Sequence, residues 1–187
     1  MREGDFEAKL SKSLHIYRHA LTQATRLVLV GVGDGSAKSI KTAVATAVGG
    51  LKSNGTKKLV ISLNLVDGTD AASAQAAFFA ATDSSYVYTT TKPKVDARKF
   101  THITVAVRKD AMNAAQLIAS QAYITPAIAG IEYAKEWGNR PANHATPNLL
   151  GKAAQSLDKY KNISVDVLGL KEVSKLGMGS FMSVAQG

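Results

Sequence analysis

The sequence predicts an α/β fold: a mixed, largely parallel sheet flanked by helices, followed by a linking helix and an incomplete start of a second α/β domain. Short apolar runs alternate with longer segments of helical periodicity, which is typical of parallel βα units. In the run after residue 57, Val60 makes the second face partly apolar, as expected when helices cover a sheet. A stretch rich in proline and asparagine interrupts the pattern after residue 138.

Three strands and three helices are expected before that stretch. The expected strands cover residues 26–30, 58–65 and 102–107, and the expected helices cover residues 40–51, 71–81 and 111–138. Gly31 ends the first strand, and Asn54-Gly55 ends the first helix. Pro126 leaves two alternatives for the last helix: a kink, or a new helix that begins at Thr125-Pro126.

Residues 139–147 are interpreted as a linker and a domain boundary, because they hold two prolines and two asparagines and show no periodicity. A helix capped by Thr146-Pro147, a strand over 163–168 and a short helix over 171–176 are expected next. These elements cannot close a core, so the apolar tail over 180–187 is expected to open a further domain. The predicted domains are an N-terminal α/β domain (1–110), a linking helix (111–138) and an opening segment (139–187).

The composition restricts the class of protein. The chain has 187 residues, 45% hydrophobic and 20% charged, which is a globular balance. It has no cysteine, so disulfides, thiolate catalysis and Cys-ligated zinc are excluded. No apolar run approaches the roughly 20 residues of a membrane span, and the start has no apolar signal-peptide region. A cytoplasmic protein without membrane contact is expected.

The net charge of +9 lies mostly in the first third of the chain. Residues 1–60 hold ten Lys and Arg against four Asp and Glu, whereas residues 61–110 hold six against five and residues 111–187 hold seven against five. An excess of this kind favours an anionic partner, with DNA as the obvious candidate. The alternative is a dispersed, solvated basic surface, which is favoured because no run of consecutive basic residues occurs.

Gly31-Val32-Gly33-Asp34-Gly35 follows a predicted strand and precedes a predicted helix, where a phosphate-binding turn would lie. The spacing is G-x-G-x-G rather than G-x-G-x-x-G. No acidic residue follows about 20 positions later to bind a ribose. A structural turn is therefore favoured over a nucleotide site.

No catalytic, cofactor-binding or metal-ligating residue is assigned. His15 and His19 have a metal-compatible i, i+4 spacing if they lie on a helix, but no H-E-x-x-H pattern accompanies them. An exposed pair is therefore favoured. The remaining candidates have structural explanations or no partner: His102 opens a strand, His144 lies in a loop, Asp67 and Asp70 cap a turn, and Asp158, Asp166 and Glu172 are exposed.

Two segments resemble a known family. Residues 138–150 read GNRPANHATPNLL, which is similar to the N-x-P-A-N-x-x-T-P junction of leucyl aminopeptidases (cytosol aminopeptidases). Residues 176–187 read LGMGSFMSVAQG and resemble the family's L-G-M-G stretch. Weaker likeness is found over residues 3–6, 26–33 and 86–94. Asn139, Pro141 and Asn143 match the junction and are interpreted as structural.

The resemblance implies a macro-domain-like N-terminal domain, a linking helix and a catalytic domain with two divalent metal ions, manganese or zinc. Such enzymes are hydrolases that release N-terminal amino acids from peptides and assemble as hexamers. The family's N-T-D-A-E-G-R-L metal motif is absent from this chain. The chain is therefore expected to be truncated at both ends, to hold no metal ion and to be inactive alone. It would serve structure, oligomerisation or regulation, with the remainder of the enzyme as its partner.

Two alternatives remain open. Some bacterial relatives use their N-terminal domains to bind DNA in recombination or transcription control, so a DNA-binding module is the second hypothesis. The third is ADP-ribose binding at the turn over residues 31–35, by analogy with macro domains.

Overall fold

The computed structural model describes residues 6–20, 22–51, 56–94 and 100–185. It divides into two compact units, Met1–Glu136 and Trp137–Gly187. Three features of the sequence analysis lie outside the described residues: the helix end at Asn54-Gly55, the weak resemblance at residues 3–5, and the last two residues of the tail. Across the four described ranges, no helix is long and apolar enough to cross a bilayer.

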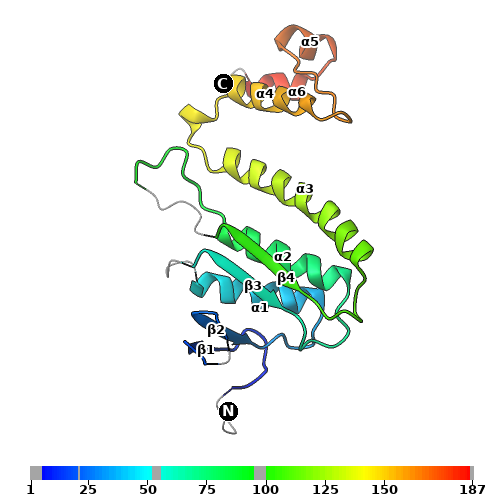
Figure 1. The fold of residues 1–187 in the computed structure, drawn as a ribbon. Coiled ribbons are helices and arrows are strands. Elements are labelled where there is room, and N and C mark those ends of the chain that lie inside the picture. Colours follow the sequence, from blue (N-terminus) through cyan, green and yellow to red (C-terminus); the bar gives the residue numbers. More distant parts are fainter. Residues whose placement is uncertain (1–5, 21, 52–55, 95–99, 186–187) are drawn as a thin grey trace. The chain divides into compact units, whose positions relative to one another are not determined.

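The first unit contains two small sheets and two helices that pack against each other (Figure 1). Strands β1 (Ser13–Tyr17) and β2 (Arg26–Val30) pair antiparallel, and β3 (Lys58–Ser62) and β4 (His102–Ala106) pair parallel. Helix α1 (Ala37–Leu51) follows β2, and α2 (Ala71–Ser85) connects β3 to β4. The mixed α/β fold is therefore confirmed, with the strands divided between one parallel and one antiparallel pair.

The core lies between α1, α2 and one face of the β3–β4 sheet. Ile40 and Val48 of α1 are almost fully buried, as are Ala77 and Ala81 of α2. Alanine lets α2 approach α1 closely, because its side chain ends at Cβ. In β3, Leu59 and Ile61 pack against this core, whereas the alternate residues, among them Val60, are exposed. One face of the sheet is thus covered by helices.

Helix α2 begins at an N-cap and extends beyond the predicted end. Asp70 accepts hydrogen bonds from the backbone N–H of Ser73 at 2.8 Å and from its hydroxyl at 2.9 Å. These bonds keep the pKa of Asp70 below its ordinary value. The helix continues past Ala81 to Ser85 and ends at Tyr86, whose backbone N–H donates to the Asp83 carbonyl.

Helix α3 (Ala114–Gly138) passes through Pro126 without restarting. The helix begins at Ala114 rather than at residue 111, because Asn113 and Gln116 cap it reciprocally. The Gln116 backbone N–H donates to Asn113 Oδ1 at 2.9 Å, and the Asn113 N–H donates to Gln116 Oε1 at 3.0 Å. Pro126 is exposed, so loss of its N–H hydrogen bond occurs where water can compensate.

The second unit is built from short helices. These are the 3₁₀ turn η2 (Ala142–His144), α4 (Pro147–Gln155), the 3₁₀ turn η3 (Ser156–Lys159), α5 (Leu170–Lys175) and α6 (Gly179–Ala185). The predicted Thr146-Pro147 start of α4 is confirmed, since Thr146 accepts a hydrogen bond from the Leu149 N–H at 3.4 Å. The apolar tail forms α6, which was not predicted as a helix.

The strand predicted over residues 163–168 is wrong. The segment forms no ladder with any described strand, and a strand needs a neighbour to satisfy its backbone groups. Its Val165 N–H instead donates to the carboxylate of Asp158 at 2.7 Å. Ile163 and Val167, which alternate as in a half-buried strand, are 44% and 48% exposed.

The first prediction concerns Ile40, which is fully buried in the core of the first unit. We expect Ile40→Ala to lower the free energy of unfolding by about 2–5 kcal/mol, because it removes a fully buried side chain and leaves a cavity. Ile118→Ala is the matched control, since Ile118 is also helical but 68% exposed; its change should stay within about 0.5 kcal/mol. Urea unfolding followed by circular dichroism measures both. Equal losses in the two variants would contradict this core.

The second prediction concerns Asp70, the N-cap of α2. At neutral pH, Asp70→Ala should lower the free energy of unfolding by about 1 kcal/mol. Because the folded-state pKa of Asp70 lies below 3.8, the charged cap stabilises the fold above that value. The difference between wild type and variant should therefore shrink as the pH falls through the folded-state pKa. Asp70→Asn keeps a capping oxygen, so urea unfolding should show a smaller loss without that pH dependence.

Candidate functional site

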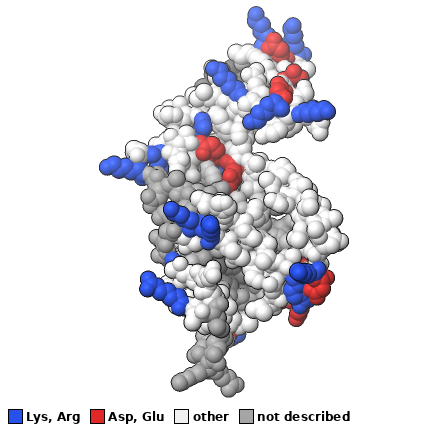
Figure 2. All heavy atoms as spheres, in the orientation of Figure 1, with Lys and Arg blue, Asp and Glu red and all other residues white. Residues whose placement is uncertain are grey.

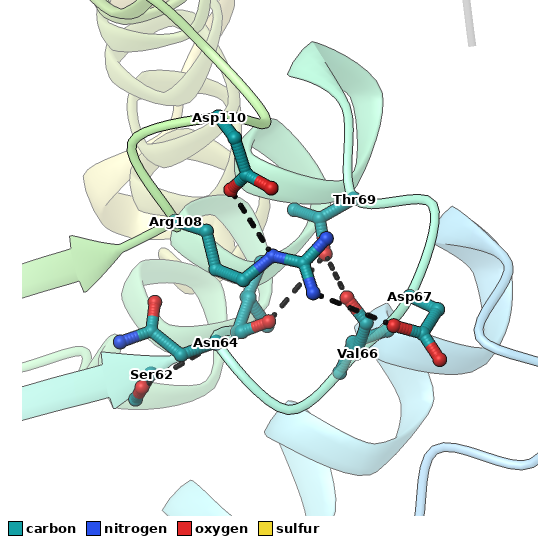
Figure 3. Close-up of polar contacts among 8 residues, drawn as sticks. Ser62, Asn64, Val66, Asp67, Thr69, Arg108 and Asp110 are labelled. Atoms are coloured by element: carbon teal, nitrogen blue, oxygen red, sulfur yellow. Dashed lines mark hydrogen bonds and ion pairs between the residues drawn. The ribbon is translucent and has the colours of Figure 1, made fainter.

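Ligands of open α/β sheets bind outside the carboxyl ends of the parallel strands, so this edge of the β3–β4 sheet is the first place to search. Figure 3 shows the loops that follow β3 and β4 meeting there. The turn after β2 joins them, because a Cβ on Gly35 would lie only 3.5 Å from Val66 Cγ1. Residues 31–36, 63–70 and 107–113 therefore form one loop cluster, which we call the carboxyl-edge loops.

The carboxyl-edge loops are held by contacts among their own residues. Arg108 Nη1 lies 3.5 Å from Asp67 Oδ1, and its Nε lies 3.3 Å from Asp110 Oδ1 (Figure 3). The Thr69 hydroxyl donates to the Val66 carbonyl at 2.8 Å. The carboxylates of Asp67 and Asp110 are exposed, so these ion pairs contribute little stability each. Asp67 thus pairs with Arg108 instead of capping a helix, contrary to expectation.

Carboxylates of the protein already lie at the starts of α1 and α2. Asp34 Oδ1 accepts from the Ser36 N–H at 3.0 Å and from the Ser36 hydroxyl at 2.8 Å. Hydrogen bonds from Ser39 and Ser36 lower the pKa of Asp34 to about 2, so it is charged at neutral pH. Asp70 is the N-cap of α2, whereas Asp34 lies two residues before Ser36, whose hydroxyl accepts the Ser39 N–H at the start of α1. A phosphate at either helix start would meet a fixed negative charge.

The glycines of the turn after β2 have structural reasons. A Cβ on Gly31 would lie 2.1 Å from the Lys9 carbonyl oxygen, so only glycine fits beside that backbone. Gly33 and Gly35 have φ of 60° and 72°, the left-handed region that glycine favours. Together with Asp34, these contacts support a structural turn over a nucleotide or ADP-ribose site.

The histidines are placed apart. His15 lies on β1 rather than on a helix, and His19 follows that strand, so the helical i, i+4 pair is wrong; both side chains are exposed, as favoured. His102 opens β4 and shares a hydrogen bond of 3.0 Å with the Thr101 hydroxyl, while His144 ends η2. Among the described residues, no group of three or more His, Cys, Asp or Glu side chains could hold a metal ion.

Two carboxylates of the second unit bind backbone N–H groups, and the third, Asp166, is exposed as expected. Asp158 accepts the Val165 N–H, and Glu172 accepts the Gly169 N–H at 3.1 Å. In the junction, the Arg140 guanidinium stacks over the Trp137 ring at 3.9 Å from its centroid. This contact joins the last turn of α3 to the junction, and the structural interpretation of Asn139, Pro141 and Asn143 stays a prediction.

The basic side chains are dispersed on the face shown in Figure 2. Lys and Arg lie there in separate groups, several beside Asp or Glu, with uncharged atoms between them. This view supports the dispersed basic surface over a single anion-binding patch.

The carboxyl-edge loops indicate no ligand or reaction, whereas the known proteins that are similar to this chain indicate its family. Residues 1–94 match the model of the cytosol aminopeptidase family N-terminal domain, and residues 132–187 match the model of the catalytic domain of the same family. A probable cytosol aminopeptidase of Polaromonas sp. is 46% identical over 100% of this chain and 36% of its own length. One of Acidovorax sp. is 41% identical over the same shares.

Solved structures share the fold. A mutant of tomato leucine aminopeptidase superposes with a TM-score of 0.77 at 20% identity, covering 92% of this chain and 34% of that one. The bottromycin maturation enzyme BotP gives a TM-score of 0.72 at 21% identity, covering 92% of this chain and 36% of that one. A second BotP structure, in complex with Mn, gives 0.65 at 21% identity, covering 82% and 31%.

The chain thus spans about a third of the length of the proteins that it matches. The resemblance seen in residues 138–150 and 176–187 falls within the region that matches the catalytic-domain model. Because the two family models match in their expected order and the first covers half of the sequence, the chain belongs to the cytosol aminopeptidase family.

Proposed function

We propose that these 187 residues supply the N-terminal domain, the linking helix and the first part of the catalytic domain of a metal-dependent leucyl aminopeptidase. The two family matches, in order over one chain, carry this proposal. We keep the domain limits expected from the sequence: 1–110, 111–138 and 139–187. The activity is release of N-terminal amino acids from peptides, in the cytoplasm, by a homo-oligomer for which the family resemblance implies a hexamer.

The described residues do not fit a two-metal centre. They bring together no set of carboxylates and imidazoles, and two carboxylates of the second unit, Asp158 and Glu172, accept backbone N–H groups. We therefore propose that the metal ligands come from the part of the enzyme that corresponds to the unmatched length of the relatives. The BotP structure with Mn supports manganese as one metal that this fold accommodates.

The second unit presents its apolar side chains to solvent. Its buried hydrophobic residues among those described are Ala153 and Val173, whereas eleven large ones are at least 36% exposed: Leu149, Leu150, Tyr160, Ile163, Val167, Leu168, Leu170, Leu176, Met178, Phe181 and Val184. Large sets of exposed apolar side chains are usually covered by another part of a protein or by a partner. This supports a second unit that completes its core only against the remaining catalytic segments.

DNA binding is the weaker alternative. Its support is the excess of positive charge over residues 1–60. The separate groups of Lys and Arg in Figure 2 provide no continuous patch, and we propose no second function.

Complementation tests the proposal. The chain alone should not hydrolyse leucine p-nitroanilide in the presence of manganese, because the metal ligands lie elsewhere. Coexpression with the matching C-terminal segment of the Polaromonas relative should produce hydrolysis, measured at 405 nm as ~ a tenfold or greater rise over either part alone. Hydrolysis by the chain alone would contradict the placement of the metal ligands. A stable coexpressed complex without activity would contradict the assignment as an aminopeptidase.

Variants locate the interface in the same assay. Phe181→Ser should reduce assembly with the C-terminal segment, because Phe181 is one of the exposed apolar side chains of the second unit. Val60→Ser is the matched control, since Val60 is 66% exposed but lies on β3 of the first unit. Equal loss in both variants would argue against an interface on the second unit.

A further inference from the structure

Five side chains connect residues that match the two different family models. Asp83, Tyr86 and Thr90 lie in the region matched by the N-terminal-domain model, and Lys135 and Glu136 lie in the region matched by the catalytic-domain model. Lys135 contacts Asp83 and Tyr86, and Glu136 contacts Tyr86 and Thr90, near the end of α3 and within the first compact unit. We call this set the α3 clamp.

Lys135 makes the charged contact of the clamp. Its ammonium forms an ion pair with the Asp83 carboxylate and lies 5.4 Å from the centroid of the Tyr86 ring. The side chains of Lys135 and Asp83 are 34% and 32% exposed, so the pair is less accessible to solvent than the Arg108 pairs. Partly buried charges are screened less by salt than exposed ones, so this pair fixes position more strongly than a surface pair.

Both carboxylate oxygens of Glu136 accept hydrogen bonds from uncharged hydroxyl groups. The Tyr86 hydroxyl donates to Oε2 at 3.4 Å, and the Thr90 hydroxyl donates to Oε1. Tyr86 also ends α2, since its backbone N–H donates to the Asp83 carbonyl. Two adjacent residues of α3 therefore hold both the last turn of α2 and the segment that follows it.

The two carboxylates of the clamp lie where the helix dipoles disfavour negative charge. Asp83 lies near the carboxyl end of α2 and Glu136 near that of α3, where negative charge is unfavourable in isolation. Their partners in the clamp compensate for this. Elsewhere, the described part of α3 buries only Ser120 and Ile128, so apolar packing provides little anchorage for this helix.

We propose that the α3 clamp is an interdomain positioning device. It fixes the direction in which α3 leaves the N-terminal domain, and it thereby sets where the catalytic-domain residues begin. The five residues act through position and touch no substrate. This inference rests on the proposed function only in assigning residues 139–187, which follow α3, to the catalytic domain, and the clamp itself is tested in the 187-residue chain.

Hydrogen–deuterium exchange tests the clamp. In Lys135→Met, amide protection should fall about threefold to tenfold over residues 131–138 and 86–92, while residues 40–48 of α1 keep theirs, because only the clamp is lost. Lys152→Met is the matched control: Lys152 is an exposed lysine near the end of α4, and its replacement should leave both segments protected. Unchanged protection in Lys135→Met would overturn the proposal.

A charge reversal separates position from general stability. Asp83→Lys alone should lose protection in both segments, and the double variant Asp83→Lys, Lys135→Asp should regain most of it, since the ion pair is restored in the opposite sense. Failure of the double variant to regain protection would overturn the proposal. If α1 also loses protection in Lys135→Met, Thr90→Val decides. It removes one hydroxyl and should still loosen residues 131–138; protection equal to wild type there would count against the clamp.

The outcome is distinguishable from that of the proposed function. An inactive coexpressed complex with an intact exchange pattern would remove the aminopeptidase assignment and leave the clamp in place. An active complex with unchanged exchange in Lys135→Met would do the reverse.

Discussion

The packing of α1 and α2 on one face of the parallel β3–β4 pair is the constraint on which the first unit depends. Ile40 and Val48 contact the small side chains of α2, and this close approach is achieved because Ala77 and Ala81 present nothing larger than a methyl group. The packing fixes the starts of both helices, and with them the carboxyl-edge loops. It also fixes the end of α2, where Asp83 meets Lys135 of α3.

The carboxyl edge of a parallel sheet commonly binds ligands, and here the protein's own groups occupy it. Ser36, held by Asp34, and Asp70 accept N–H groups of the first turns of α1 and α2, and Arg108 lies between two carboxylates. A fold that places favourable dipoles at one edge can use them for an anion or for its own side chains. In this chain, hydrogen bonds to the protein's own side chains account for the G-x-G-x-G spacing of residues 31–35 as well as binding of an anion would.

Sequence reasoning succeeded where a segment is buried by its own neighbours. The strands β2, β3 and β4 and the helices α1 and α2 follow from apolar periodicity, since their cores lie within the first unit. It missed β1, whose apolar alternation is limited to Leu14 and Ile16 and whose strand is established by antiparallel pairing with β2. It was wrong for residues 163–168, because alternation indicates a strand only where a partner strand exists. Residues of a site could not be predicted for a different reason: no cluster of the described residues forms one. From the sequence, the family could be predicted only by its resemblance in the junction and tail.

The two units differ in how their apolar residues are used, and this difference explains why a clamp is needed. The first unit buries a core, so it provides a fixed reference. Among its described residues, the second unit buries Ala153 and Val173 and exposes larger side chains such as Phe181 and Leu176; our proposal assigns the burial of these side chains to the remaining catalytic segments. We propose that the direction of α3 is set from the first unit. The Lys135–Asp83 ion pair and the hydroxyl contacts of Glu136 achieve this near the last turn of α3 with little burial of apolar surface.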